Sequence, residues 1–595
     1  MGPLVRGLVV LRALAGHEAR TRVRPADLTR TTGLARSVVD RVLATLGHLG
    51  YVRADGREVV LAVGLMELGN AYLTASGVPA ALGPHVERLA AALDASVSVA
   101  VPDAEGVRIV AQAARPRAAS AGFRAGLRIG DLLPAGRCAP GALFAAAPPD
   151  WAVDDQLLEP GLVAVAVPVR DRAGRTACAV TVTSHTSRHS ADGLREEALP
   201  ALRAAVPAME AALAAHAGSG ESGDGAAWHG AEGSDAAPAS YAAEGATSAP
   251  ASRTAGSGPA LHAPHGTEGS APASYTADGG VPTPVPYGGK ARSAAAYGEE
   301  DGPAAASGAE GAPGSVPSGP LADPGSSPVE ATAPPLRSLV RGLAVLRGFG
   351  VAAAPGRGAT LSELAAAAGL ARATARRALL TLAHLGYVAA DGGRFRPLPR
   401  VLELGHAPLG ELTFAGLAVP HLRALVRRVG ESASLAVLDG PDIRYVARVP
   451  TVRIMSVDIT VGTRFPAHAT SMGRVLLAGL DARARAAWLA GEAVTRAPTP
   501  RTVTSPTELA GLLDRVAGDG YALVDQELEE GLRSLAVPVR DARGRVVAAL
   551  NVATHAGRGG AGDTRRDFLP ALRETAARIE ADVRTASAHR ALGTG

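Results

Sequence analysis

The chain has 595 residues, too many for one hydrophobic core, because single domains rarely exceed about 250 to 300 residues. Its 60 Lys and Arg against 56 Asp and Glu give a net charge of +4, so contact with nucleic acid needs a local basic face. Two cysteines offer no disulfide framework, and no apolar run approaches the ~20 residues that span a bilayer. These features predict several soluble, cytoplasmic domains without membrane contact.

The chain contains an internal repeat. LVRGLVVLRAL at 4–14 returns as LVRGLAVLRGF at 339–349, and VPVRDRAG at 167–174 returns as VPVRDARG at 537–544. A repeat this long indicates a tandem duplication of a whole domain pair, not a solenoid. Between the copies, residues 218–335 are dominated by Gly, Ala, Ser and Pro. This composition predicts a disordered linker, long enough for the two halves to dock on each other.

Residues 360–388 of the second copy have the pattern of a helix-turn-helix followed by a β wing. Thr360 and Glu363 form a capping-box pattern that starts one helix, and Gly369 ends it. The next helix is expected from Ala371 or Arg372, and apolar spacing predicts that its inner face holds Ala375, Leu379 and Leu382. Residues 387–398, with a turn at 391–393, predict the wing hairpin.

Polar residues on the outer face of this last helix are candidates for DNA contact. Arg372, Thr374 and Arg376 share that face, and Arg377 lies at its border. A charge run on a helix is most often only a solvated face, but the capping box, the short turn and the wing favour DNA. Residues 23–52 of the first copy repeat the pattern, where Arg36 and Arg41 are the corresponding candidates.

The rest of the second half alternates short helices and strands. Helices are expected at 400–405, 420–429, 470–480 and 507–519, and strands at 434–438, 444–449 and 453–457. Residues 536–540 and 546–553 predict a hairpin through the turn at 542–544. The pattern is typical of an α+β sensor-like domain with helices at both ends of an antiparallel sheet.

These motifs resemble the IclR family of bacterial one-component regulators. The resemblance rests on VRGLAVLRGF at 340–349, residues 361–388, FPAHATSMGRVLLA at 465–478 and the long segment 521–556, and it covers 338–588. More narrowly, the motifs are similar to the Pca/PobR-type branch of this family, whose members control aromatic-acid and β-ketoadipate pathway genes. The resemblance implies a winged helix-turn-helix joined by a linker helix to a GAF-like effector-binding domain, acting as dimers or tetramers on operator DNA.

The expected domain limits follow from the repeat and the resemblance. We expect a weakened winged helix-turn-helix at 1–62, a degenerate GAF-like sensor at 63–217, the linker at 218–335, a winged helix-turn-helix at 336–399 and an effector-binding domain at 400–590. The predicted fold class is therefore α+β, with two winged helix-turn-helix domains that are each followed by a sensor.

An effector site is expected at the start of the helix near residue 471. Thr470 and Ser471 precede that helix, whose free N–H groups suit a carboxylate, although Ser471 could equally be an ordinary helix cap. Arg533 could pair with an anion, or with Glu529 or Glu530. The resemblance implies effector-binding roles for Ser471, Met472, Asp525, Ser534 and Asn551.

No enzyme, cofactor or metal is expected. Cys178, His185 and His189 are irregularly spaced and lack a fourth ligand, so they do not predict zinc. No Gly-x-Ser-x-Gly elbow, phosphate loop or paired carboxylate motif is present, which argues against catalysis.

The first half departs from the second in both domains. Asp40 stands where the second copy has Arg376, and Val38 where it has Thr374, so the first copy should bind DNA more weakly. Its capping box is replaced by residues 24–27, and both copies have alanine, Ala35 or Ala371, where a cap would help the last helix.

The first sensor is also shortened. It lacks the residues that contain the second sensor helix of the other copy. The effector positions of the second half are replaced by Ala139, Pro140, Ala164 and Thr181. We expect this sensor to bind no effector of the usual kind.

The leading hypothesis is an effector-responsive transcription regulator of aromatic-acid or related carboxylate catabolism, acting on double-stranded operator DNA in the cytoplasm, on the nucleoid. The expected effector is a small carboxylate or aromatic acid. The halves are expected to pair as an intramolecular pseudo-dimer, with a homo-oligomer as the other arrangement. The alternative function is a protein-interaction module, derived from such a regulator, that has lost operator recognition.

Overall fold

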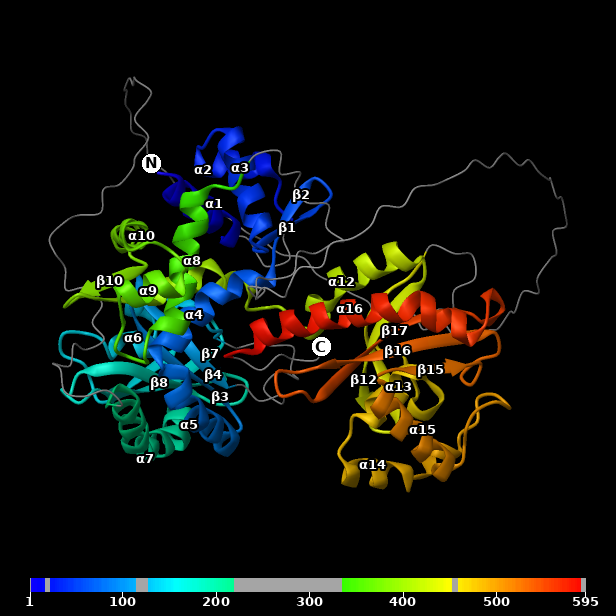
Figure 1. Cartoon of the computed structure of the whole chain (residues 1–595). Helices are drawn as coiled ribbons and strands as arrows, with labels where there is room; N and C mark the ends of the chain where they lie inside the picture. Colours follow the sequence, from blue (N-terminus) through cyan, green and yellow to red (C-terminus); the bar gives the residue numbers. More distant parts are fainter. Residues whose placement is uncertain (1, 17–21, 114–126, 219–333, 452–458, 590–595) are drawn as a thin grey trace, which may run out of the picture. The chain divides into compact units, whose positions relative to one another are not determined.

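A computed structural model describes residues 2–16, 22–113, 127–218, 334–451 and 459–589 (Figure 1). The predicted linker lies almost entirely outside the described residues, as does the strand expected at 453–457. In the described parts the predicted α+β class is confirmed, because each half contains a helical domain with a small hairpin and a domain built on a six-stranded antiparallel sheet.

The first helical domain follows the predicted helix-turn-helix order. Its elements are α1 (Pro3–Ala15), α2 (Pro25–Thr32), α3 (Arg36–His48) and the hairpin of β1 (Val52–Asp55) and β2 (Glu58–Leu61). Helix α2 starts with a proline at its first turn and has no side-chain cap, as expected from the loss of the capping box.

The second helical domain confirms the capping box and the wing. It consists of α8 (Arg337–Ala352), β9 (Ala359–Thr360), α9 (Leu361–Ala367), α10 (Arg372–His384), β10 (Val388–Asp391) and β11 (Arg394–Pro397). Thr360 Oγ1 accepts from Glu363 N at 3.3 Å, and Thr360 N donates to Glu363 Oε2 at 2.7 Å. Strand β9 pairs with β11, so the wing has a third strand that was not predicted.

The segments that follow the wings differ between the copies. The first copy has 3₁₀ turn η1 (Val63–Leu65) and a regular helix, α4 (Met66–Ser76). The second has 3₁₀ helix η4 (Pro399–Leu404) and a four-residue helix, α11 (His406–Leu409), so the helix expected at 400–405 is a 3₁₀ helix. The physical reason is Pro408, which stands where α4 has Tyr72. Proline inside a helix removes one N–H donor and clashes with the carbonyl of the preceding turn.

The second sensor is built on one antiparallel sheet with strand order β14-β13-β12-β17-β16-β15. The strands are β12 (Ser432–Asp439), β13 (Asp442–Val449), β14 (Arg464–Pro466), β15 (Ala522–Asp525), β16 (Leu532–Arg540) and β17 (Val546–His555). Side chains alternate between the two faces, so Leu435, Leu535 and Leu550 point to one face and Ala436, Ala536 and Ala549 to the other. Small alanines on the second face leave room for polar side chains beside them.

Helices cover both faces of this sheet (Figure 1). The leucine face packs against α12 (Phe414–Val429) and α16 (Ala561–Ser587). The alanine face packs against α13 (Ser471–Ala478) and α15 (Pro506–Asp519), with α14 (Ala482–Leu489), η5 (Ala467–Ala469), η6 (Glu492–Thr495) and η7 (Ala556–Arg558) as short connections. Helix α12 starts before the predicted Pro420, because Thr413 Oγ1 accepts from Gly416 N at 3.2 Å and caps an earlier turn.

The first sensor keeps the same sheet, in the order β5-β4-β3-β8-β7-β6. Its elements are α5 (Val78–Leu93), β3 (Ser96–Asp103), β4 (Gly106–Ala113), β5 (Leu132–Leu133), η3 (Ala135–Arg137), α6 (Ala139–Ala142), β6 (Ala152–Asp155), β7 (Leu162–Arg170), β8 (Thr176–His185) and α7 (Ala191–Gly218). Between α6 and β6 the described chain has no helix equivalent to α15, as expected from the shortened sequence.

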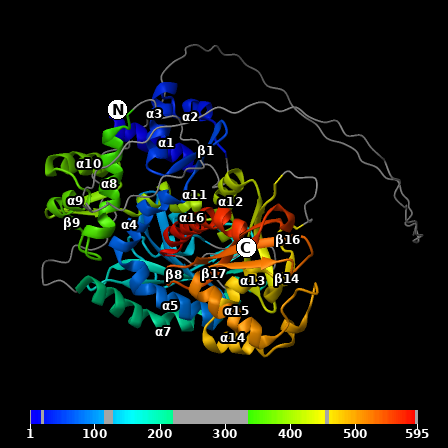
Figure 2. The same cartoon turned by 45° about the vertical axis from the view of Figure 1, so that its right-hand side comes forward.

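Helix α7 of the first sensor is long and apolar enough to span a membrane by length and composition. It packs on β7, however, and on α5, beside which Figure 2 shows it, and it buries Leu194, Leu202 and Met209. Helix α16 covers the second sheet in the same way. Contact with the sheet and α5 therefore accounts for the buried part of α7, which is 17% of its most apolar stretch.

Candidate DNA-binding surface and effector site

The predicted arginines of the second copy lie on the exposed side of α10. Arg372, Arg376 and Arg377 are exposed, and Thr374 is half-buried. None of the three arginines forms an ion pair with a carboxylate of the described residues. Ala375, Leu379 and Leu382 are buried beneath them, as predicted from their spacing. Helix α10 thus presents three uncompensated guanidinium groups to solvent, the charge pattern that phosphate contact requires.

One exposed apolar residue joins this surface. Leu380 is 55% exposed and lies one helical turn after Arg376. An exposed leucine has no packing role, but its methyl groups suit contact with a thymine methyl group in the major groove. Helical spacing had already placed Leu379 and Leu382, but not Leu380, on the inner face.

The corresponding helix α3 carries a different charge pattern. Arg36 and Arg41 are exposed, but Arg36 Nε lies 3.6 Å from Asp40 Oδ2. The carboxylate therefore neutralises one of the two predicted arginines. It also repels phosphates itself, as expected from the sequence.

The first helices of the two copies contact each other reciprocally. A Cβ atom added at Gly7 would lie 2.4 Å from Leu339 Cδ1, and one added at Gly342 would lie 2.4 Å from Leu4 Cδ1. The two leucines occupy the same position of the repeat, as do the two glycines. Each leucine of one helix thus fills the space that a glycine leaves on the other, which is the pattern of a two-fold interface.

Two ion pairs between the halves are reciprocal in the same way as the leucine–glycine contacts. Arg12 Nε lies 3.1 Å from Glu403 Oε1, and Arg347 Nη1 lies 3.2 Å from Glu67 Oε2. Arg12 and Arg347 are equivalent in the repeat, and so are Glu67 and Glu403. Both pairs join one half of the chain to the other. The two helical domains are therefore related by an approximate two-fold arrangement within a single chain.

In the second sensor, the start of α13 lies against β16. Ser471 Oγ donates to Ser534 Oγ at 2.8 Å, and Thr470 Oγ1 caps the helix by accepting from Gly473 N at 3.0 Å. Thr470, not Ser471, is therefore the capping residue. The N–H groups of Ser471 and Met472 donate to no described residue. A helix start with free N–H groups beside two hydroxyls is a site for a carboxylate.

Asn551 lies on the same face of the sheet. It pairs with Ala536 on β16 and with Ser434 on β12, and its side chain is 4% exposed. Asn551 Oδ1 is buried without a hydrogen-bond partner. A buried unpaired acceptor costs about 1 to 3 kcal/mol, so this oxygen suits a ligand that brings a hydroxyl donor.

Sequence reasoning missed Ser434 and Arg448 on this face. They are opposite each other on β12 and β13, and Arg448 Nη1 donates to Ser434 Oγ at 3.5 Å. Tyr445 is on the same face, where burial raises the pKa of its phenol to about 12. Period-two alternation was the available signal for Ser434, but the register shift between β12 and β13 puts Arg448 and Tyr445, three residues apart, on the same face, which alternation alone does not predict.

Two predicted effector residues have structural partners. Arg533 Nε and Nη2 each donate to the Asp525 carboxylate at 3.0 Å, so the pair is bidentate. The prediction that Arg533 pairs with Glu529 or Glu530 is wrong in its partner, because Asp525 is opposite Arg533 on the neighbouring strand β15. Met472 is 1% exposed and packs in the apolar cluster under α13.

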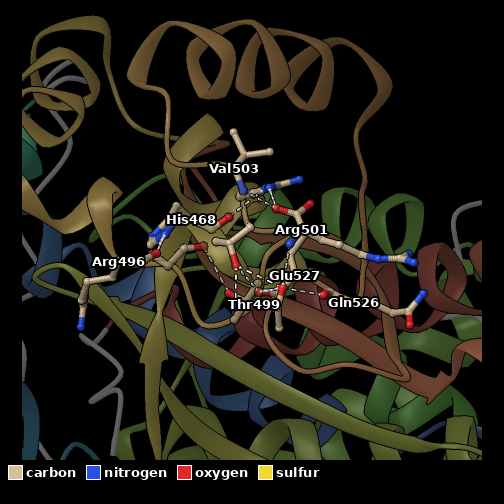
Figure 3. A network of polar contacts seen from close by, with 11 residues as sticks. His468, Arg496, Thr499, Arg501, Val503, Gln526 and Glu527 are labelled. Carbon is tan, nitrogen blue, oxygen red and sulfur yellow. Dashed lines mark hydrogen bonds and ion pairs between the residues drawn. The ribbon is translucent and has the colours of Figure 1, made fainter.

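A buried polar network holds the start of α13 in place (Figure 3). Arg474 is 3% exposed, donates to His468 O at 2.9 Å and forms an ion pair with Glu527. Glu527 Oε2 also accepts from Val503 N at 3.0 Å, while Thr502 Oγ1 donates to Glu527 O at 2.6 Å. The network joins α13 to the segment before β16, and sequence reasoning missed it.

His468 is the titratable group of this network. It is fully buried, and its Nε2 lies 2.7 Å from Arg496 O, so Nε2 carries the proton (Figure 3). Burial lowers the pKa of His468, and the nearby guanidinium groups of Arg496 and Arg474 lower it as well. The ring is therefore neutral near pH 7.

The first sensor has few polar groups at the equivalent place. Ala139, Pro140 and Ala164 are apolar, and all three are buried. Thr181, at the position of Asn551, is fully buried, and its Oγ1 has no hydrogen-bond partner. It is opposite Ser98, whose Oγ is also unpaired. The hydroxyls that α13 contributes in the second sensor are thus missing from α6.

The histidines near Cys178 have other partners. His189 lies 2.8 Å from Ser184 Oγ and 3.1 Å from Glu197 Oε2, and His185 lies 2.7 Å from Ser187 Oγ. Burial raises the pKa of the Cys178 thiol to about 12. Within the described ranges, no group of three or more His, Cys, Asp or Glu could hold a metal ion.

Comparison with known protein families finds the same two kinds of domain in both halves of the chain. The IclR helix-turn-helix domain matches residues 3–56 and 338–392, and the bacterial transcriptional regulator IclR C-terminal domain matches 149–211 and 406–581. The first copy of the C-terminal domain is matched only in part, in keeping with its shortened sensor.

Among curated relatives, the Pca regulon regulatory protein of Pseudomonas putida is 44% identical over 238 residues, which is 40% of this chain and 80% of that protein. The p-hydroxybenzoate hydroxylase transcriptional activator of Acinetobacter baylyi is 34% identical over 261 residues, 43% of this chain and 95% of that protein. A solved transcriptional regulator from Rhodococcus sp. RHA1 is 50% identical with a TM-score of 0.40, covering 43% of this chain and all of that one. These relatives are regulators, not enzymes. The chain belongs to the IclR family of bacterial DNA-binding transcriptional regulators, in its Pca/PobR-type branch, as a tandem duplication with a degenerate first copy.

Proposed function

We propose that this regulator binds double-stranded operator DNA through α10, with α3 as a weaker second contact, and that a small aromatic or aliphatic carboxylate bound at α13 controls this binding. The observation that carries the DNA contact is the set of unpaired, exposed guanidinium groups on α10. Catalysis has no part in the proposal. The protein acts in the cytoplasm, on the nucleoid, where its operator lies.

The effector class is supported by the chemistry at the start of α13. Free N–H groups at Ser471 and Met472 and the two paired hydroxyls suit a carboxylate, and the unpaired Asn551 Oδ1 suits a hydroxyl hydrogen. An aromatic acid with a ring hydroxyl offers both groups. The printed name of the Acinetobacter relative, an activator for p-hydroxybenzoate hydroxylase, supports the same class.

The other two predicted effector residues, Asp525 and Met472, have different proposed roles. Asp525 is paired with Arg533 on the leucine face of the sheet, away from α13, so we propose a supporting role for it and no direct contact with the effector. Met472 supplies an apolar wall. The domain limits at 62, 217, 335, 399 and 590 remain predictions. The two halves act as an intramolecular pair, which the reciprocal contacts of α1 and α8 support.

DNA binding is tested by fluorescence anisotropy of the full chain on the promoter next to its own gene, over a range of salt. Arg372→Ala with Arg377→Ala should weaken binding and lower the salt slope by about one for each lost phosphate contact. The control, Arg515→Ala on α15, removes an exposed arginine elsewhere and should change neither. Absence of specific, salt-sensitive binding would instead support a protein-interaction module.

Effector binding is tested by calorimetry of the full chain with 4-hydroxybenzoate, protocatechuate and β-ketoadipate. Asn551→Ala should weaken the binding of the hydroxylated aromatic acids roughly fivefold, the value of about one hydrogen bond. Thr181→Ala makes the equivalent truncation in the first sensor and should leave binding unchanged. No heat from any of the three acids contradicts the carboxylate proposal.

A further inference from the structure

The two recognition helices belong to one chain, and the chain itself pairs them. The reciprocal contacts of Leu4 with Gly342 and of Leu339 with Gly7 join α1 to α8, and each of these helices packs on the recognition helix of its own domain. In a homodimer the equivalent helices would have identical sequences by symmetry. Here they were free to diverge.

The divergence between the two recognition helices lies mainly outside their buried faces. The buried positions are conservative, since Val39, Leu43 and Leu46 of α3 match Ala375, Leu379 and Leu382 of α10. Positions outside the core differ more. Val38, Asp40 and Ala44 of α3, all half-buried, stand where α10 has the half-buried Thr374 and the exposed Arg376 and Leu380, whereas the exposed Arg36 and Arg41 match Arg372 and Arg377. Folding requirements do not explain this pattern, because the residues that differ contribute little to the core.

The differing residues favour different bases. An arginine donates two hydrogen bonds to guanine O6 and N7, whereas an aspartate accepts from the cytosine N4 amino group. The Asp40 side chain is about half-exposed, and its Oδ2 lies 3.6 Å from Arg36 Nε, so the carboxylate is at the solvent-accessible surface of α3. Leu380 can contact a thymine methyl group, and Ala44 is too short to do so.

We infer that one chain recognises an asymmetric operator made of two unlike half-sites, a guanine-containing half read by Arg376 on α10 and a cytosine-containing half read by Asp40 on α3. This inference rests on the proposed DNA-binding function. It differs from the expectation for a symmetric homodimer, in which operator palindromy mirrors the two-fold axis of the protein.

The test is selection of bound DNA by the full chain from random duplexes of about 40 base pairs, longer than two half-sites one helical turn apart. We expect the recovered sites to contain two different half-sites, and native mass spectrometry to give one chain per duplex. A palindromic consensus, or two chains per duplex, overturns the inference but leaves the DNA-binding function intact. Failure to enrich any sequence overturns both.

A substitution at Asp40 can distinguish base recognition from a nonspecific effect of the charge of the protein on DNA binding. Asp40→Arg gives α3 the residue that α10 has at this position, so it should change the preferred bases in one half-site only. It should also improve binding to a duplex with two α10 half-sites by roughly tenfold. Asp192→Arg makes the same charge change at the exposed start of α7 and should leave the sequence preference unchanged. If Asp40→Arg behaves like this control, Asp40 does not read a base and the inference is wrong.

Discussion

Arg474 and Glu527 are the pair of residues that holds the start of α13 in place. Both are buried, and their ion pair is supported by hydrogen bonds to His468 O and from Val503 N. Burying two charges costs desolvation energy, so the intact pair adds little net stability. Removing one partner is nonetheless strongly destabilising, because the other is left charged and unpaired in the interior. Ser471, which we propose contacts the effector, is three residues before Arg474 on the same helix.

We predict that Arg474→Met destabilises the second sensor by about 3 to 5 kcal/mol, because Glu527 is left as an unpaired buried carboxylate. Combining it with Glu527→Gln should recover much of this loss, since no buried charge then remains. Thermal unfolding of the full chain, followed through the transition of the second sensor, measures both. Arg485→Met, at a more exposed pair with Asp514 on the surface of the same domain, is the control and should cost well under 1 kcal/mol.

His468 makes the stability of the same network depend on pH. Its folded-state pKa is lowered by burial, so below the ordinary value of 6.5 the unfolded chain binds more protons than the folded one. Stability from this group is therefore complete above about pH 6.5 and is lost as the pH falls toward the lowered pKa. We predict that the melting temperature of the second sensor falls from pH 7 to pH 5, and that His468→Gln reduces this fall. Equal pH slopes for the two proteins would contradict the prediction.

The residues of the site were only partly predictable from sequence. Ser471, Ser534 and Asn551 could be proposed because they belong to long family-specific segments. The structure puts Ser534 and Asn551 on one face of the sheet and brings Ser471 of α13 against Ser534. The ion partner of Arg533 could not, because strand register, not proximity in sequence, puts Asp525 opposite it. Arg474 and Glu527 are 53 residues apart and form a pair only once the chain has folded.

Among whole elements, the recognition helices show the clearest local weakness. Ala371 and Ala35 occupy the N-cap positions of α10 and α3 with extended backbone angles and make no side-chain cap. Helices α9 and α15, by contrast, are capped by Thr360 and Ser505. The first N–H groups of α10 and α3 are therefore available to DNA phosphates rather than satisfied within the protein.

We predict that Ala371→Ser stabilises the second helix-turn-helix by about 1 kcal/mol, since a serine hydroxyl can accept from the N–H groups of the first turn. Hydrogen exchange of α10 amides measures the gain. The matched change Ala35→Ser should slow exchange in α3 by a similar factor and leave α10 unchanged. Thr360→Ala should have the opposite effect on α9, because it removes an existing cap. Faster exchange in α10 after Ala371→Ser would contradict the prediction.

Element types were largely predictable, and the exceptions have physical causes. Periodicity and caps located α10, the wing and the β16–β17 hairpin, because these signals are local. The 3₁₀ form of η4 depends on Pro408, which lies after the segment concerned. Strand β9 has only two residues and forms because β11 pairs with it, so no local sequence pattern predicted this strand.

At the scale of the whole chain, the two duplicated halves retain different structural features. The second copy keeps the exposed arginines, the helix start with free N–H groups and the complete helical cover of its sheet. The first copy keeps the surfaces that contact the second: Leu4, Gly7, Arg12 and Glu67 each have a reciprocal partner. The first copy therefore retains the contacts that join the two helical domains, although it lacks the hydroxyls found at the start of α13.

The contacts of Gly7 and Gly342 allow this pairing to be tested in the full chain. Because a Cβ at either glycine would overlap a leucine of the other helix, we predict that Gly7→Leu weakens the α1–α8 contact by about 1 to 3 kcal/mol. Hydrogen exchange should then accelerate in both α1 and α8, and Gly342→Leu should accelerate the same two helices. Gly83→Leu on α5, where a Cβ meets no atom within 4 Å, is the control and should leave both unchanged. Faster exchange confined to the substituted helix would show that the halves do not pair in solution, since reciprocal packing requires each helix to protect the other.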